Sequence, residues 1–164
     1  ADTNRMDKAE QEYLRAKKIR EQLATENPSA YQPDLAMSCN NLGNLYADTN
    51  RMDKAEQEYL RAKEMYEQLA VEHPSAYLTY LAISCYNLGI FYYENNQMKL
   101  AEQELLRAKE LYEQLTALVP EQYTSDLADA CENLGELYEN TDRPEQAAAE
   151  YARAEELRKQ AKTL

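Results

Sequence analysis

The sequence has 164 residues, of which 29% are charged, and its formal net charge is −12 at pH 7. This length suits one domain or a short repeat array. The acidic balance disfavours partners that require a basic face, namely nucleic acids and anionic membrane surfaces. No apolar run in the sequence is long enough to span a bilayer, so we also expect no membrane-embedded segment.

An internal repeat of 46 residues organises the chain. Its three glycines, Gly43, Gly89 and Gly135, stand 46 residues apart, and residues 1–17 are identical to residues 47–63. Self-similarity at a fixed period of this length is typical of repeat architectures. The three cysteines follow the same spacing, and an odd number of equivalent cysteines does not indicate a set of disulfides. We therefore expect a reducing compartment and a cytoplasmic protein.

In chain order, the sequence opens at residues 1–28 with a single helix of the second type, meaning one that is equivalent to the second helix of each later helix pair. Three helix pairs follow, at residues 29–74, 75–120 and 121–164. No segment shows sustained alternation of polar and apolar residues, so we expect no strands. The prediction is one all-α domain of seven helices.

The second helix of each pair has the clearer signal. In segment 52–73 the apolar residues recur at steps of 4 and 3, which places them on one side of a helix. The first helix is expected over about 33–49, over about 77–95 and from near Ser125, after a proline that ends the preceding helix in each copy. Clusters of asparagine and threonine predict the turns inside each pair.

A glycine in the middle of the first helix needs a reason, because it costs about 1 kcal/mol relative to alanine. We expect Gly43 to let the second helix of its pair approach closely, with the small side chain of Ala55 in the facing position. The same reasoning pairs Gly89 with Ala101.

One copy of the repeat reads Leu42-Gly43-x-x-Tyr46, then Ala55-x-x-x-Tyr59 and Ala62. This order recurs in three copies and resembles the tetratricopeptide repeat. Two departures from the ordinary repeat of about 34 residues are the longer period and Cys39 at the usual tryptophan position. They resemble the long-helix branch, to which the kinesin light chain repeats belong.

The resemblance implies a right-handed superhelical solenoid of antiparallel helix pairs, in which the first helices line a concave groove. It also implies a scaffold that binds a peptide or protein there, and not an enzyme.

Helical geometry separates two faces of the first helix. Cys39, Leu42, Gly43 and Tyr46 form the predicted packed face. The opposite face carries the candidate peptide-binding residues, which we call the groove stripe: Asn40, Asn41 and Asn44; Tyr86, Asn87 and Ile90; Glu132, Asn133 and Glu136. We expect Tyr86 and Ile90 to be exposed, and exposed apolar residues favour a partner over drift on a solvated face.

An asparagine recurs at one stripe position in every pair, at Asn41, Asn87 and Asn133. Its amide can both donate to and accept from an extended peptide backbone, which is the role that the resemblance implies. The alternative is that each amide bonds a neighbouring helix or turn. The third copy is acidic and has no lysine on its stripe, so a groove that binds charge should prefer a basic segment. The alternative is a solvated acidic face.

No combination of residues indicates catalysis, a cofactor or a metal site. The one histidine, His73, lies beside Pro74 at a helix end and has no partner at ligand spacing. The glycines are isolated and form no phosphate-binding loop. We expect neither enzymatic activity nor a cofactor.

The two ends of the array differ. Arg158 and Ala161 replace the tyrosine and leucine of earlier copies, and a polar outer face is typical of a terminal cap. The N-terminal helix has no such cap, and its apolar residues should be left for another chain: Met6, Ala9, Tyr13 and Leu23. The competing hypothesis is therefore a structural or self-associating array, designed or recently duplicated, without a dedicated ligand.

Overall fold

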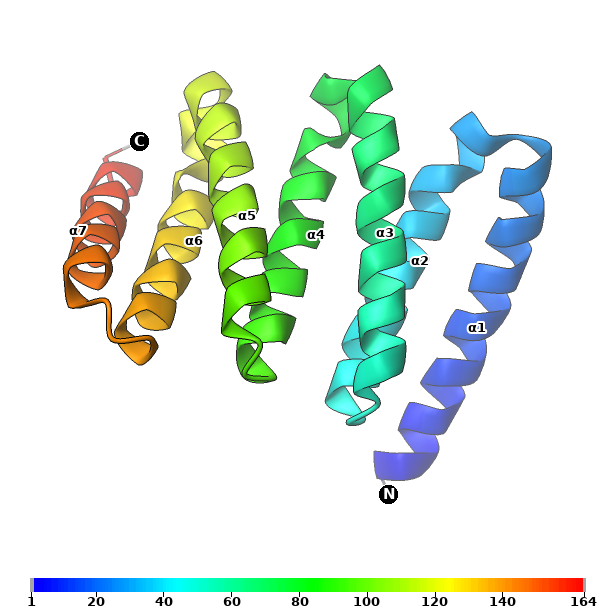
Figure 1. Ribbon diagram of the computed structural model, residues 1–164. Coiled ribbons are helices and arrows are strands. Elements are labelled where there is room, and N and C mark those ends of the chain that lie inside the picture. Colours follow the sequence, from blue (N-terminus) through cyan, green and yellow to red (C-terminus); the bar gives the residue numbers. More distant parts are fainter. Residues whose placement is uncertain (1, 164) are drawn as a thin grey trace. The chain divides into compact units, whose positions relative to one another are not determined.

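The computed structural model describes residues 2–163, with side chains described for Met6 and for residues 8–163. This part of the chain contains seven α-helices and no strand, which confirms the all-α prediction. The helices, shown in Figure 1, are α1 (Asp2–Glu26), α2 (Pro28–Asp48), α3 (Met52–Glu72), α4 (Pro74–Glu94), α5 (Met98–Leu118), α6 (Pro120–Asn140) and α7 (Pro144–Ala161).

The first helix of each pair begins at a proline. α2, α4 and α6 start at Pro28, Pro74 and Pro120, so the predicted starts near residues 33, 77 and 125 are wrong. Proline suits the first position of a helix because its backbone angle is already helical and because the N–H that it lacks would have no partner there. In this chain each of these prolines is therefore the first residue of the next helix, and a single residue separates it from the end of the preceding helix.

The turns inside the pairs depend on residues in the left-handed backbone region. Asn50, Asn96 and Asp142 have φ angles of 57°, 58° and 56°, a region that asparagine and aspartate tolerate better than other residues with a side chain. In the first of these turns the backbone N–H of Arg51 bonds to the Tyr46 carbonyl at 2.8 Å. This bond satisfies a carbonyl that the end of α2 leaves open. The predicted turn positions are confirmed.

The chain divides into two compact units, Ala1–Tyr77 and Leu78–Leu164. In the first unit α2 packs against both α1 and α3, and in the second unit α6 packs against both α5 and α7 (Figure 1). Each unit has its own buried core, to which α2 contributes Cys39 and Leu42 and α6 contributes Cys131 and Leu134. The face that the sequence marks as packed is the buried one.

Gly43 of α2 faces an aromatic ring of α3. A Cβ atom at Gly43 would lie 2.8 Å from ring carbons of Tyr59, closer than such contacts occur. The expected facing residue, Ala55, is buried, but the nearest atoms to this position all belong to Tyr59. The residue next to the glycine is therefore one turn later than predicted, and the missing side chain makes room for a large ring.

Candidate functional site

The groove stripe of α2 lies on the side of the helix away from its buried residues. Asn41 and Asn44 are exposed, and Asn40 is half-buried. The Oδ1 atom of Asn44 accepts a hydrogen bond of 2.7 Å from the hydroxyl of Tyr59. A partner at Asn44 would therefore meet the Nδ2 group rather than the carbonyl oxygen.

The groove stripe of α4 is more covered than the sequence suggests. Tyr86, Asn87 and Ile90 are half-buried, whereas Ile83, on the preceding turn, is 38% exposed. Tyr86 is covered because its ring reaches α6, where its hydroxyl oxygen accepts a hydrogen bond of 2.8 Å from Nδ2 of Asn133. Burial, and next the negative charge of Asp129, raise the pKa of Tyr86. The tyrosine therefore stays neutral over the physiological range of pH.

The groove stripe of α6 is tied to α4 by this contact. Asn133 also donates a 2.8 Å hydrogen bond to the carbonyl oxygen of Asp129 on its own helix. Two turns after Tyr86 and Asn133 towards the C-termini, Asn140 of α6 bonds to the hydroxyl of Tyr93 of α4. At Asn133 the amide therefore bonds a neighbouring helix, which is the alternative that the sequence left open.

The acidic side chains of α6 are partly neutralised from α7. Arg158 forms ion pairs with Asp129, at 3.1 Å, and with Glu132. Glu136 of the groove stripe is exposed. Burial and the charge of Asp129 together raise the pKa of Asp126. The sequence identified Arg158 as a cap residue but did not identify its carboxylate partners, which lie on another helix.

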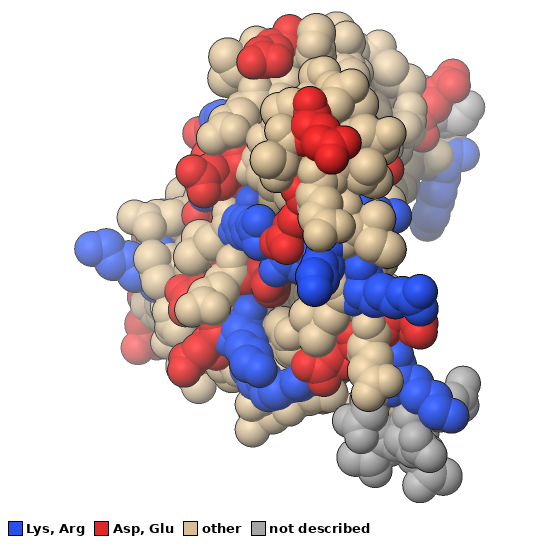
Figure 2. Space-filling view, turned by 90° about the vertical axis from the view of Figure 1, so that its right-hand side faces the viewer, with Lys and Arg blue, Asp and Glu red and all other residues tan. Residues whose placement is uncertain are grey.

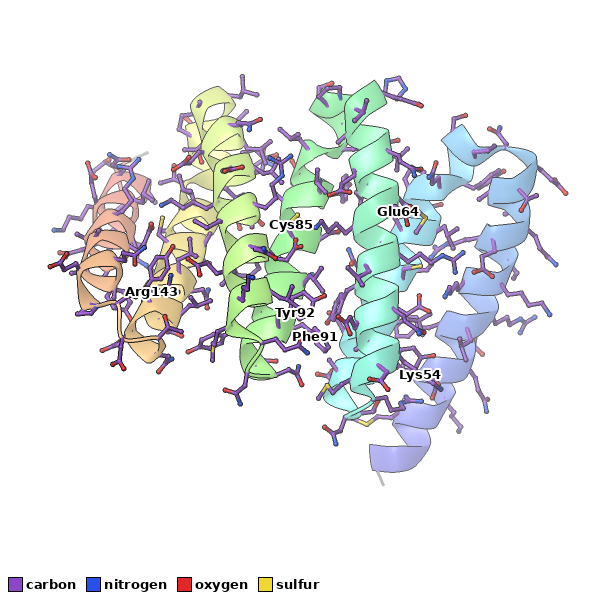
Figure 3. The ribbon with its side chains drawn as sticks, in the orientation of Figure 1. Lys54, Glu64, Cys85, Phe91, Tyr92 and Arg143 are labelled. Atoms are coloured by element: carbon purple, nitrogen blue, oxygen red, sulfur yellow. The ribbon has the colours of Figure 1, made fainter. Side chains whose placement is uncertain are left out.

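Ion pairs between successive second-type helices were not anticipated. In the first unit Lys17 of α1 pairs with Glu58 of α3 at 2.5 Å, and in the second unit Lys109 of α5 pairs with Glu150 of α7 at 2.6 Å. Both pairs are 41 residues apart, and we call them the lysine–glutamate ladder. At the turn before α7, Arg143 (Figure 3) pairs in the same offset with Glu102 at 2.8 Å. In the sequence, each of these lysines is followed 41 residues later by a glutamate, and this recurring spacing could have predicted the ion pairs.

Each ladder glutamate lies against a buried cysteine. Burial, and next the charge of Glu58, raise the pKa of the Cys39 thiol to about 12. Burial likewise raises the pKa of Cys131 to about 12, although the charge of Lys109 acts in the opposite direction. Cys85 is buried at the equivalent place on α4 (Figure 3). None of the three thiols forms a disulfide, and a thiol with a pKa as high as those of Cys39 and Cys131 is a poor nucleophile.

In the described part of the chain, no three histidine, cysteine, aspartate or glutamate side chains are grouped so that they could hold a metal ion. No described helix is long and apolar enough to cross a membrane. His73 is exposed, and its ring centroid lies 6.5 Å from that of Tyr77.

The repeated pairs match known family models. Models described as tetratricopeptide repeat match residues 35–75, 82–115 and 128–160. The chain belongs to the tetratricopeptide repeat family. Each matched segment includes the Leu-Gly-x-x-Tyr order of a first helix and most of the second helix of the same pair.

A similar solved structure agrees with this tetratricopeptide assignment at the level of the fold. The chain is similar to BtubC (BKLC) from P. vanneervenii, with 24% sequence identity and a TM-score of 0.78 over 98% of this chain. The match covers 59% of the BtubC chain, so this chain spans about three-fifths of that protein's length. A second structure, MamA, is 16% identical with a TM-score of 0.35, covering 96% of this chain and 95% of that one. No curated protein sequence matches this chain.

Proposed function

We propose that this chain is a protein-interaction scaffold that binds a peptide or protein segment through the groove stripe of α4 and α6. Tetratricopeptide repeats generally mediate contacts between proteins, which supports this class of function and gives no reason to propose catalysis. The stripe of α2, in the other unit, would supply polar contacts of its own.

The apolar surface of α4 carries the proposal. Ile83 is exposed, and Tyr86 and Ile90 keep part of their surface accessible. Aromatic and large aliphatic side chains that stay partly accessible beside amides are typical of protein-binding surfaces. Asn87 lies between Tyr86 and Ile90, where its amide could pair with a peptide backbone.

The hydrogen bonds of α6 limit what the partner can use there. Both polar contacts of the Asn133 Nδ2 group are internal, so a bound backbone would donate to its Oδ1 atom. The pairing of Arg158 with Asp129 and Glu132 removes part of the negative charge. We therefore propose that a basic segment is favoured only modestly, through the exposed carboxylate of Glu136.

A displayed library of unstructured peptides tests the proposal. Peptides selected by the chain should lose binding to Ile90→Ser and to Asn87→Ala variants. Leu106→Ala is the matched control, because Leu106 is exposed on α5, away from the groove stripe. Selection of no peptide, or equal loss with the Leu106 variant, would refute a groove-stripe site.

The competing function is a self-associating array, and one observation favours it. Tyr13 and Met6 on α1 are each 39% exposed. Ala9 and Leu23 of the same expected surface are half-buried. Sedimentation of the chain across a range of concentrations distinguishes a monomeric scaffold from an array that pairs through this helix.

A further inference from the structure

Two contacts of the same kind join α4 to α6 in the second unit. The hydroxyl of Tyr86 accepts a hydrogen bond from Asn133, and the hydroxyl of Tyr93 accepts one from Asn140. The partners are 47 residues apart in both contacts, and the contacts lie seven residues, or about 10 Å, apart along each helix. Tyr86 and Tyr93 are half-buried, so part of each ring remains accessible.

The second of these contacts lies beside two carboxylates. The hydroxyl of Tyr151, on α7, donates a hydrogen bond of 2.9 Å to Glu139. Burial, this hydrogen bond and the charges of Glu139 and Glu136 raise the pKa of Tyr151 to about 12. Tyr93 adds to the same rise, so these groups lie close enough to act on one hydroxyl. We call Tyr93, Glu136, Glu139, Asn140 and Tyr151 the tyrosine–glutamate cluster.

The two carboxylates of the cluster have no cation beside them. Arg158 pairs with Asp129 and Glu132, which lie nearer the start of α6. In the described part of the chain no lysine or arginine pairs with Glu136 or Glu139, and both are exposed. Elsewhere basic side chains lie among the acidic ones, as Figure 2 shows for the side on which α1 lies. The cluster is therefore a local concentration of negative charge beside an accessible ring.

The packing of the repeat does not require a carboxylate at this place. In the first unit the residue equivalent to Glu136 is Asn44, and the residue equivalent to Tyr151 is Tyr59. The hydroxyl of Tyr59 donates to the amide oxygen of Asn44 instead of to a carboxylate. Both tyrosine rings lie against a glycine of the first helix of their pair. The same ring packing is thus obtained without negative charge, so packing alone does not explain the carboxylates of the cluster.

The molecule itself shows which group suits a tyrosine ring beside a glutamate. The guanidinium of Arg143 lies 4.4 Å from the centre of the Tyr138 ring and pairs with Glu102 at 2.8 Å. The guanidinium of Arg51 lies 4.5 Å from the centre of the Tyr46 ring in the same way. A guanidinium is planar and weakly hydrated, so it can stack on an aromatic face and bond a carboxylate at the same time.

We propose that the tyrosine–glutamate cluster binds an arginine side chain of the partner segment, with its guanidinium over the ring of Tyr93 and paired with Glu136. This inference rests on the proposed function and names one side chain that the partner should carry. Charge complementarity supports this occupant, because the chain has a net charge of −12 and the cluster has no cation of its own. Arginine fits better than lysine, because it can pair with a carboxylate through two N–H groups.

The surface next to the cluster suits the rest of the segment. Ile90 is half-buried and lies between Tyr86 and Tyr93 along α4. An apolar side chain near the arginine of the partner would contact Ile90 and the accessible part of the Tyr86 ring. The cluster therefore selects one cationic side chain at a defined place, rather than a basic segment as a whole.

The test compares peptides selected from the displayed library by the unchanged chain and by a Glu136→Gln variant. The unchanged chain should enrich arginine at one position of the peptides, and the variant should not. Replacing that arginine with citrulline, which has the same shape but no charge, should weaken binding to the unchanged chain at least about fivefold. The same replacement should change binding to Glu136→Gln less than about twofold. Fluorescence anisotropy with labelled peptides measures all four affinities.

Glu121→Gln is the matched control on the same helix. Glu121 is exposed at the start of α6, so its substitution removes the same charge about 22 Å away along the helix. This variant should keep the preference for arginine over citrulline. Tyr93→Leu, which lacks the ring, should lose much of that preference, whereas Tyr93→Phe should retain most of it. Thermal unfolding of each variant checks that the fold is preserved.

The outcomes separate this inference from the proposed function. Peptides that lose binding to Ile90→Ser but show no preference for arginine would overturn the inference and leave the proposed function standing. Equal affinity for peptides with lysine in place of the arginine would also overturn it. Equal loss of the preference in Glu121→Gln and Glu136→Gln would show that overall charge, and not the cluster, selects arginine. Selection of no peptide at all would refute the proposed function, and this inference with it.

Discussion

α2 and α4 bury residues of the same types but carry different residues on the groove stripe. Both helices bury a cysteine, a leucine, a glycine and a tyrosine in the order Cys-x-x-Leu-Gly-x-x-Tyr. On the groove stripe, Asn40 and Asn44 of α2 are replaced by Tyr86 and Ile90 of α4. The comparison shows that the same buried order recurs in both helices, while the chemistry of the groove stripe changes between them.

The largest expected effect tests the buried order. Leu42→Ala should lower the free energy of unfolding by about 2–5 kcal/mol, because this side chain is completely buried and its removal leaves a cavity. Leu60→Ala, at an exposed position of α3, should change it by less than about 0.5 kcal/mol. Urea unfolding followed by circular dichroism measures both values. Similar losses for the two variants would contradict the assignment of faces.

The second test uses the buried thiols and pH. Folding raises the pKa of Cys39 from 9.0 to about 12, so the folded state favours the protonated thiol. Its contribution to stability is complete below pH 9 and is lost as the pH rises from 9 towards 12. The loss should approach roughly 1.4 kcal/mol per pH unit for each such thiol. A Cys39→Ala, Cys131→Ala variant should lose stability less steeply in this range, and parallel slopes would contradict the prediction.

A smaller effect is expected at the glycine of the buried order. Gly43→Ala should destabilise the first unit by about 1–2 kcal/mol, since crowding against Tyr59 outweighs the gain in helix propensity. In a Tyr59→Ala background the same substitution should be neutral or stabilising, because the ring is gone. A double-mutant cycle from urea unfolding gives the coupling between the two positions. Independent effects would show that the ring does not limit this site.

The smallest effects are expected on the groove stripe. Asn41→Ala should change the free energy of unfolding by less than about 0.5 kcal/mol, because the side chain is exposed. Asn133→Ala should cost about 1 kcal/mol, since it removes the hydrogen bond to Tyr86. Thermal unfolding of the two variants side by side measures the difference. Equal stabilities would mean that the hydrogen bond between Asn133 and Tyr86 contributes nothing to stability.

Local features of the chain predicted most of the fold. The 46-residue period, the steps of 3 and 4, and the asparagine clusters predicted seven helices and their turns. The starts of α2, α4 and α6 were misplaced, because a proline was interpreted only as the end of a helix and not also as the first residue of the next. The residue facing Gly43 was misplaced by one turn, because spacing along a helix does not give the register against its neighbour.

The sequence by itself determined the repeat, the helical class and the buried face of each first-type helix. These properties follow from periodicity and backbone preference, which act within a few residues. Only the tertiary structure decided that Tyr86 bonds Asn133, that Arg158 neutralises Asp129, and that Lys17 pairs with Glu58. Such contacts join residues tens of positions apart, and they depend on how far one helix slides and turns against another. That register is set by the interlocking of many side chains at once, so no local pattern contains it.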